Sequence, residues 1–193
     1  GISPHFSHMP QNLSKFLFAL LLTLTQSAFA QSSLLPELAK AGFSVGQVVW
    51  TLVPMHNTDS DTNQDPTLRG LTRIEIVDAF EGVEHGRTWR YLSAKLRTGK
   101  TAKLILPGYR PPEQLLSSKD PKTFGWSNSA LKSVSQGRFF FGMTRAQFIA
   151  VLGYPDDVNE SGDRHGTYEQ WVYKRYGGDD YFYFRNGKYE AYN

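Results

Sequence analysis

The sequence predicts an α+β protein with a β-rich N-terminal unit and a C-terminal unit of two short helices on a three-stranded antiparallel sheet. Apolar runs of strand length, separated by turn residues, occupy residues 44–107. Helical segments at 127–136 and 144–152 then precede three aromatic strand segments. Prolines and glycines between these two patterns, at 108–126, predict a linker.

Composition indicates a globular chain and narrows the classes of function. Of 193 residues, 40% are hydrophobic, and the net charge is only +3 with basic and acidic residues interspersed. A nucleic-acid-binding protein concentrates basic residues on one face, so we expect no nucleic-acid partner. The chain has no cysteine, which excludes disulfides, thiolate metal ligands and a cysteine nucleophile.

The first 30 residues predict export. Residues 1–8 precede Met9 and are typical of an expression-vector remnant. Lys15, a short apolar run and the site Ala28-Phe29-Ala30 follow in the order of a secretory signal peptide. The run is shorter than the ~20 residues of a transmembrane helix. We expect cleavage after Ala30 and a periplasmic protein of the bacterial cell envelope without a transmembrane segment; a buried N-terminal helix is the alternative.

The β-rich unit, residues 31–107, is expected to begin with a helix and continue as strands. Ser33 can cap a short amphipathic helix that ends at Gly42. The predicted strands are 46–54, 71–80 and two within a hairpin over 87–106 that turns at Thr98-Gly99. Four strands with short turns indicate a small antiparallel β-sheet or an SH3-like barrel.

The segment between the first two strands carries oxygen side chains at alternate positions. The four residues Asp59, Asp61, Asn63 and Asp65 have the spacing of a calcium loop. However, Gln64 and Gly70 stand where such a loop has a glycine and a bidentate glutamate. We therefore expect a solvated surface loop at 59–65, and no metal or other cofactor.

The segment 137–158 encodes one short helix with clear limits. Thr144 and Gln147 have the spacing of a capping box, and Gly153 followed by Pro155 ends the helix. Its expected buried side chains are Phe148, Ile149, Val151 and Leu152, with Arg145 and Gln147 facing water. Because no titratable group lies on the buried side, we expect this helix to pack and not to catalyse.

Three motifs carry a family resemblance. They are GMTRAQFIAVLGYPDDV at 142–158, EQWVY at 169–173 and YFYFRNGK at 181–188, where Asn186-Gly187 is also a strong hairpin signal. Together they resemble the SmpA/OmlA family, which includes the BamE-like lipoprotein of the outer-membrane β-barrel assembly machinery. The resemblance covers residues 127–193. It implies two helices on a three-stranded sheet, an envelope location, and binding of proteins or envelope components rather than catalysis.

The chain departs from this family in two respects. No lipidatable cysteine follows the signal peptide, and the β-rich unit is not part of the family's small domain. We therefore expect a periplasmic protein that shares the fold, linked to outer-membrane assembly or integrity through its partner.

Aromatic residues of the C-terminal strands predict a protein-binding face. In a strand, successive side chains point to opposite faces, so one aromatic set must fill the core and the other must stand outward. Tyrosine and tryptophan are concentrated at protein interfaces. The candidates are Tyr168, Trp171, Tyr173, Tyr181, Tyr183 and Tyr189. Aromatics scattered over a wet face, or covered by the N-terminal unit, are the alternative.

The hairpin at 87–106 is a second candidate surface. Alternation places Trp89, Tyr91, Lys95 and Arg97 on one side. Such a face could stack on sugar rings or bases, or contact anionic lipid headgroups. An ordinary strand with one aromatic in the core and the cations in water is the alternative. Peptidoglycan and anionic lipid thus stay open as partners.

No residue pattern indicates catalysis. The cluster of Asp163, Arg164, His165 and Glu169 lies between glycines and two predicted strands, as expected of a polar hairpin loop. Nucleophile elbows, phosphate loops and dinucleotide fingerprints are missing. We expect a non-enzymatic binding protein of the cell envelope. The rival hypotheses are a cell-wall or glycan-binding module and, by analogy with the similar fold of β-lactamase inhibitor proteins, an inhibitor of an enzyme.

Overall fold

The computed structural model describes residues 32–59, 67–108 and 110–192, and the chain is α+β with mostly antiparallel sheets. The predictions of a vector remnant and signal peptide at 1–30, and of the calcium-like loop beyond Asp59, lie outside these residues. Across the described ranges, no helix is long and apolar enough to span a membrane.

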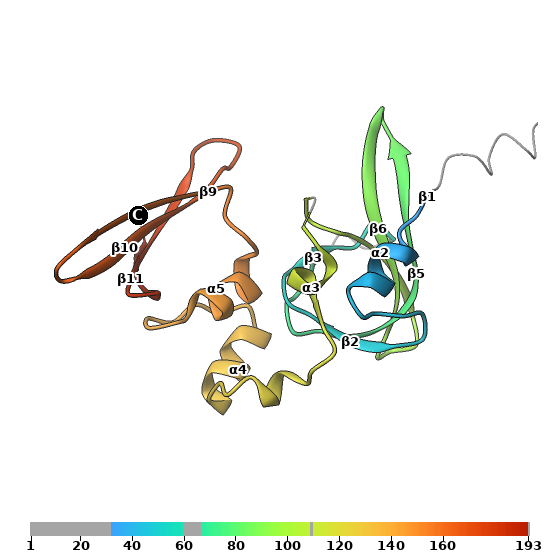
Figure 1. Cartoon of the computed structure of the whole chain (residues 1–193), viewed down its shortest axis with the longest axis horizontal. Coiled ribbons are helices and arrows are strands. Elements are labelled where there is room, and N and C mark those ends of the chain that lie inside the picture. Colours follow the sequence, from blue (N-terminus) through green and yellow to red (C-terminus); the bar gives the residue numbers. More distant parts are fainter. Residues whose placement is uncertain (1–31, 60–66, 109, 193) are drawn as a thin grey trace, which may run out of the picture.

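The N-terminal unit is built on a six-stranded sheet with the order β7-β6-β5-β2-β8 and with β1 paired to β5. Its strands are β1 (Ser32–Ser33), β2 (Val48–Thr51), β5 (Arg73–Glu84), β6 (Arg87–Leu96), β7 (Thr101–Ile105) and β8 (Leu116–Ser117). The short strands β3 (Met55–His56) and β4 (Thr67–Leu68) pair separately. After β3, Asn57 bridges to Leu104 of β7, so the chain leaving β2 returns to the opposite sheet edge and the sheet curls around its core (Figure 1).

Alternating apolar residues fill the core of this unit. Ile74 and Ile76 of β5 face inward, and a register shift between Ile76 and Asp78 then turns Ala79 to the same side. Leu92 and Ala94 of β6 lie opposite and are fully buried. Helix α2 (Leu35–Lys40) adds Leu38 to the cluster. The predicted helix and hairpin are thus present.

The prediction of a linker at 108–126 is wrong over the middle of that range. Helix α3 (Pro112–Leu115) and strand β8 lie there, and β8 pairs with β2 at the edge of the first sheet. Leu115 and Leu116 are fully buried in the N-terminal core. Two leucines among prolines therefore attach this segment to the first unit, and the 3-10 helix η1 (Pro121–Thr123) leads on to the second.

The C-terminal unit has helices α4 (Asn128–Ser135) and α5 (Arg145–Leu152) and a sheet of order β12-β11-β10-β9. Its strands are β9 (Asp157–Asp163), β10 (Gly166–Tyr173), β11 (Asp180–Arg185) and β12 (Lys188–Tyr192). The prediction of three strands is wrong, since β9 is a fourth. All of its residues are exposed, so it lacks the apolar alternation by which strands are recognised. The hairpin turn at Asn186-Gly187 is confirmed by positive φ angles of 49° and 71°.

Phe148 of α5 is the centre of the C-terminal core. Its ring lies 5.0 Å from the rings of Phe182, Phe184 and Tyr189, measured between centroids. The capping box of Thr144 and Gln147 is confirmed. The expectation that Gln147 faces water is wrong, because its side chain folds back to accept a 2.8 Å hydrogen bond from the Thr144 amide and is buried.

Helix α5 lies between the C-terminal sheet and the N-terminal unit (Figure 1). Ile149 packs against both hydrophobic cores. Gly70 of the N-terminal unit is buried so close to α5 that a β-carbon there would lie 2.1 Å from the Ala150 carbonyl oxygen. Nearby, the Tyr154 hydroxyl donates a 3.3 Å hydrogen bond to the Gln114 carbonyl. The two units are therefore docked through α5.

Gly70→Ala tests this contact. The added methyl group has no room against the α5 backbone, and overpacking of this kind costs about 1–3 kcal/mol. We expect a loss of that size in the free energy of unfolding, measured by denaturant titration. Gly162→Ala is the matched control, because a β-carbon there meets its nearest atom at an ordinary 3.5 Å. Equal stability of the two variants would contradict the docking contact.

Candidate functional site

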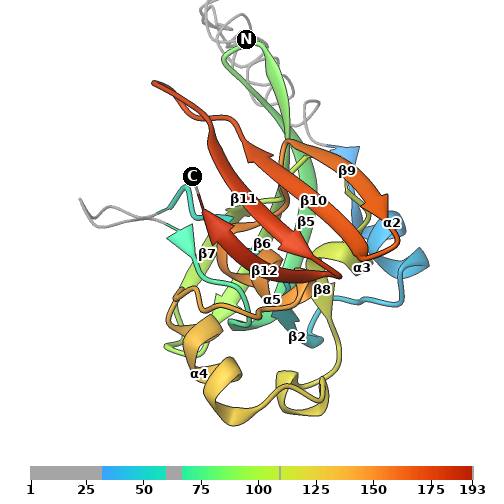
Figure 2. The ribbon, with the colours of Figure 1, turned by 90° about the vertical axis from the view of Figure 1, so that its left-hand side faces the viewer.

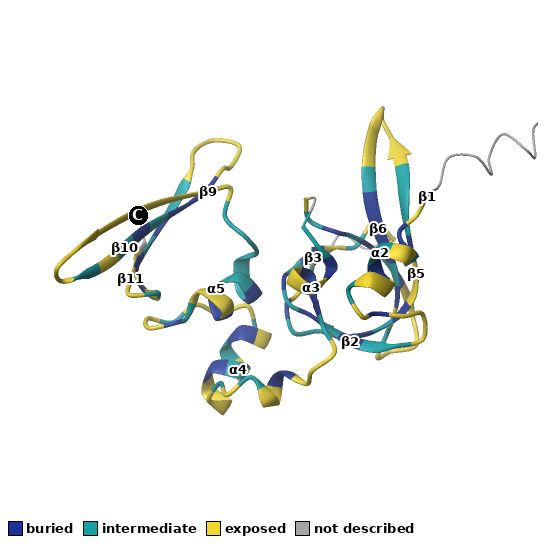
Figure 3. Cartoon of the chain, viewed as in Figure 1, coloured by how far each residue is buried: buried dark blue, intermediate teal, exposed yellow. Residues whose placement is uncertain are grey.

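Burial divides the six candidate aromatics into two groups. Trp171, Tyr173 and Tyr189 are only 3%, 4% and 6% exposed, because they face α5 and pack around Phe148. The expectation that these three residues lie on an accessible face is wrong. The strand register decides this, since Trp171 lies opposite Phe182 and Tyr189 lies opposite Phe184, both core residues. Figure 3 shows the resulting mixture of buried and accessible positions along the strands.

The other three candidates lie on the opposite side of the sheet. We call this side the outer face and define it by Asn159, Tyr168, Gln170, Tyr181, Tyr183 and Arg185. In Figure 2 the C-terminal sheet is in front of every other element, so no helix or strand of the described chain covers this face. The three tyrosines are each partly exposed. Alternation therefore yields a tyrosine surface of half the predicted size.

Hydrogen bonds hold the polar residues of the outer face in place. The Asn159 amide donates to the Gln170 side-chain oxygen at 3.0 Å, and the Gln170 amide donates to the Tyr183 hydroxyl at 3.1 Å. The Arg185 guanidinium lies over the Tyr168 ring, 5.6 Å from its centroid. A cavity of about 360 Å³ opens beside Asn159, Tyr168, Gln170 and Tyr183, and Glu160 and Glu190 also line it. The face thus offers aromatic rings, amide donors and acceptors, and the Arg185 cation, with Lys188 opposite it in the register.

Sequence reasoning missed Asn159, Gln170 and Arg185. Gln170 is two residues from Tyr168, and Arg185 is two residues from Tyr183, so each points to the same side of its strand as that tyrosine. The sequence pattern alone could therefore have predicted both. Asn159 could not be found in this way, because β9 itself was not predicted. The missed residues are the polar half of the surface.

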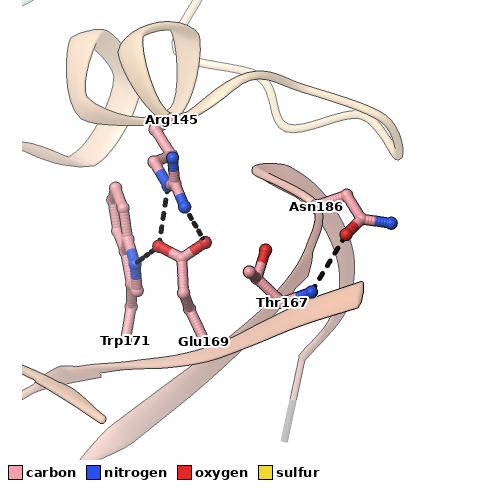
Figure 4. Close-up of polar contacts among 5 residues, drawn as sticks. All are labelled: Arg145, Thr167, Glu169, Trp171 and Asn186. Atoms are coloured by element: carbon pink, nitrogen blue, oxygen red, sulfur yellow. Dashed lines mark hydrogen bonds and ion pairs between the residues drawn. The ribbon is translucent and has the colours of Figure 1, made fainter. Parts of the chain in front are cut away.

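A buried ion pair lies on the other side of β10 and joins it to α5 (Figure 4). The Glu169 side chain is only 3% exposed, and both its oxygens accept hydrogen bonds from Arg145, one of them at 2.7 Å from Nε. Trp171 Nε1 also donates to the carboxylate at 3.1 Å. The carboxylate raises the pKa of Arg145. We call these three residues the Glu169 clamp.

The acid–base cluster considered around 163–169 does not assemble. Asp163 accepts a 2.7 Å hydrogen bond from the backbone amide of His165 within the β9–β10 turn, while Glu169 is fully engaged in the clamp. Both oxygens of the buried Glu169 carboxylate accept hydrogen bonds, as a buried ion pair with a structural role requires. The clamp joins β10 to α5 on the inner side of the sheet, behind the outer-face residues Tyr168 and Gln170.

The basic hairpin of the N-terminal unit is less accessible than its sequence suggests. Trp89 is partly exposed, and Lys95 and Arg97 are exposed, but Tyr91 is only 1% exposed. Its ring lies beside Gly82, where a β-carbon would come within 3.1 Å, and beneath Lys103 Nζ at 4.1 Å from the ring centroid. Including Tyr91 in an accessible face was therefore wrong, because Gly82, diagonal to it on the neighbouring strand, leaves room for the ring to lie on the sheet.

Arg145→Met tests the clamp. The substitution keeps an unbranched apolar stem but leaves the Glu169 carboxylate buried with one donor. A fully buried pair costs 3–5 kcal/mol to break, so we expect a loss of about 2 kcal/mol here, because the Arg145 side chain is half exposed. Denaturant titration measures it. Arg138→Met, at an exposed arginine without an ion pair among the described residues, is the control and should change stability by less than about 0.5 kcal/mol.

Alkaline unfolding tests the burial of Tyr91. Burial, reinforced by the Glu84 carboxylate, raises the pKa of Tyr91 to about 12. A raised tyrosine pKa adds stability below the unfolded value of about 10 and loses it as pH rises through the folded value. Between about pH 10 and 12, the free energy of unfolding should therefore fall less steeply with pH in Tyr91→Phe than in the parent chain. Denaturant titration at increasing pH measures this slope. Tyr176→Phe, at a fully exposed tyrosine, should match the parent chain. Identical profiles for both variants would show that Tyr91 is accessible.

Comparisons with known proteins leave the function to be argued from the geometry. No protein-family model, curated protein or solved structure matches the chain. The resemblance to the SmpA/OmlA family thus stays a prediction from the motifs at 142–158, 169–173 and 181–188. The candidate site is the outer face of the C-terminal sheet, supported from behind by the Glu169 clamp and α5.

Proposed function

We propose that this chain is a non-enzymatic binding protein of the bacterial cell envelope that engages a protein partner through its outer face. The observation that carries the proposal is the position of Tyr168, Tyr181 and Tyr183 on a side of the sheet that no described element covers. Partly exposed tyrosines on an uncovered sheet face are typical of surfaces that a second protein covers.

The chemistry of the outer face favours a protein over a small molecule. Tyrosine gives a large contact area and has few rotatable bonds, so it loses little entropy on binding. Gln170 is already held between Asn159 and Tyr183, which lowers the cost of ordering it in a complex. Amide groups and the Arg185 cation can pair with the backbone and acidic groups of a partner. The face therefore combines anchors with polar contacts.

The assignment to the cell envelope is supported by sequence alone. The predicted signal peptide at 1–30 and the SmpA/OmlA-like motifs both favour it. An SH3-like barrel in the N-terminal unit is part of the same proposal and is supported by the bridge from Asn57 to Leu104. A glycan- or lipid-binding role for Trp89, Lys95 and Arg97 has less support, because Tyr91 is buried and Lys95 lies opposite Glu75.

Cross-linking and affinity measurements test the proposal. A photoactivatable phenylalanine analogue at position 183 should cross-link a discrete envelope protein, and the same analogue at position 95 should not. With that partner purified, Tyr181→Ala/Tyr183→Ala should weaken its Kd at least about tenfold, because interface tyrosines are frequent hot spots. Lys95→Ala/Arg97→Ala is the matched control on the N-terminal hairpin. Unchanged affinity for the tyrosine variant would refute the outer face as the binding surface.

A further inference from the structure

Strand β9 is a free edge of the C-terminal sheet. It pairs with β10 over seven consecutive residue pairs without a bulge, and no strand of the described chain pairs with its other side. Every one of its residues is exposed (Figure 3). Edge strands are commonly protected by proline, lysine, bulges, short length or other charged side chains, and β9 has only the last of these, in its three carboxylates. The Val158 amide donates to the Asp157 side chain at 2.9 Å, and the other outward N–H and C=O groups are available to another strand.

A groove runs beside this edge. It has a volume of about 670 Å³ and is lined by β9, by Arg145 and Ile149 of α5, by Tyr154, by the inner residues of β10 and by Arg110 of the N-terminal unit. Val158 and Glu160 lie opposite Trp171 and Glu169 in the register, so their side chains are on the α5 side of the sheet. A strand added to β9 would have the same alternation, and every second side chain would enter the groove.

The charge of β9 selects the occupant. The strand carries Asp157, Glu160 and Asp163 and no lysine or arginine, although the chain as a whole has a net charge of +3. None of these three carboxylates forms an ion pair within the described ranges. A second copy of β9 would bring like charges together across the new edge. A segment that carries lysine or arginine would instead place opposite charges there.

We propose that β9 binds an extended lysine- or arginine-bearing segment of a partner polypeptide by strand addition. Backbone hydrogen bonds to the free edge supply sequence-independent affinity, and alternate side chains supply selectivity. The apolar side chains of the segment enter the groove beside Val158, Trp171 and Ile149. Its cations lie on the opposite side of the added strand, where the register places Asp157 and Asp163. This inference uses the backbone edge, the groove and the carboxylates of β9, and none of the three outer-face tyrosines, so it does not depend on the proposal for the outer face.

Synthetic peptides of defined composition test the inference. A peptide of alternating lysine and valine, matched to the seven residues of β9, is titrated into the purified chain by fluorescence anisotropy. It should bind at least about tenfold more tightly than the matched peptide of glutamate and valine. The lysine peptide with every backbone nitrogen methylated keeps its charge but has no backbone N–H donors, so it should not bind. In the complex, amide hydrogen exchange should slow within 157–163.

Variants of the chain separate the edge from the face. Asp157→Lys/Asp163→Lys changes two exposed residues and should weaken binding of the lysine peptide at least about tenfold while strengthening binding of the glutamate peptide. Tyr181→Ala/Tyr183→Ala should leave peptide binding unchanged. Equal binding of the methylated peptide, indifference to charge reversal, loss in the tyrosine variant, or exchange protection outside β9 would each overturn the inference. A dimer of the chain with β9 already protected would overturn it as well.

Discussion

Helix α5 is the element on which both halves of the structure depend, because two different cores cover its opposite sides. Phe148 enters the C-terminal core, Ile149 contacts both cores, and the Ala150 carbonyl meets Gly70 of the N-terminal unit. A helix of eight residues is too short to be stable alone, so packing and its capping box must hold it. Because cores lie on both sides of α5, the helix lacks the usual division into one apolar side and one solvent-exposed side.

The position of α5 decides which side of the C-terminal sheet is accessible. Residues that share the alternation of Phe182 are buried against the helix, including two tyrosines and a tryptophan. The outer face is left with the remaining tyrosines and with polar neighbours. The Glu169 clamp strengthens this division, because Arg145 reaches from α5 to a carboxylate that is buried on the inner side of β10. The support and the candidate binding surface are thus opposite sides of the same strands.

Local signals in the sequence were sufficient for elements but not for their pairing. Thr144 with Gln147 and Asn186-Gly187 act within a few residues, and both were predicted correctly. Which side of the sheet Trp171 points to depends on its pairing with β11. The burial of Tyr91 depends on Gly82 of the neighbouring strand. Neither follows from the local sequence pattern. Strand β9 was missed because backbone pairing, and not burial of its side chains, places it in the sheet.

Strand β9 also connects the two proposed surfaces, because its alternate residues belong to different sides. Asn159 faces outward and donates to Gln170, while Val158 and Glu160 face the groove. A segment added to β9 would fix the strand and with it the amide that positions Gln170 and Tyr183. If both surfaces bind as proposed, ordering the edge lowers the entropy cost of binding at the face. Thermodynamic linkage then requires the converse, so a partner on the outer face strengthens binding at the edge by the same factor.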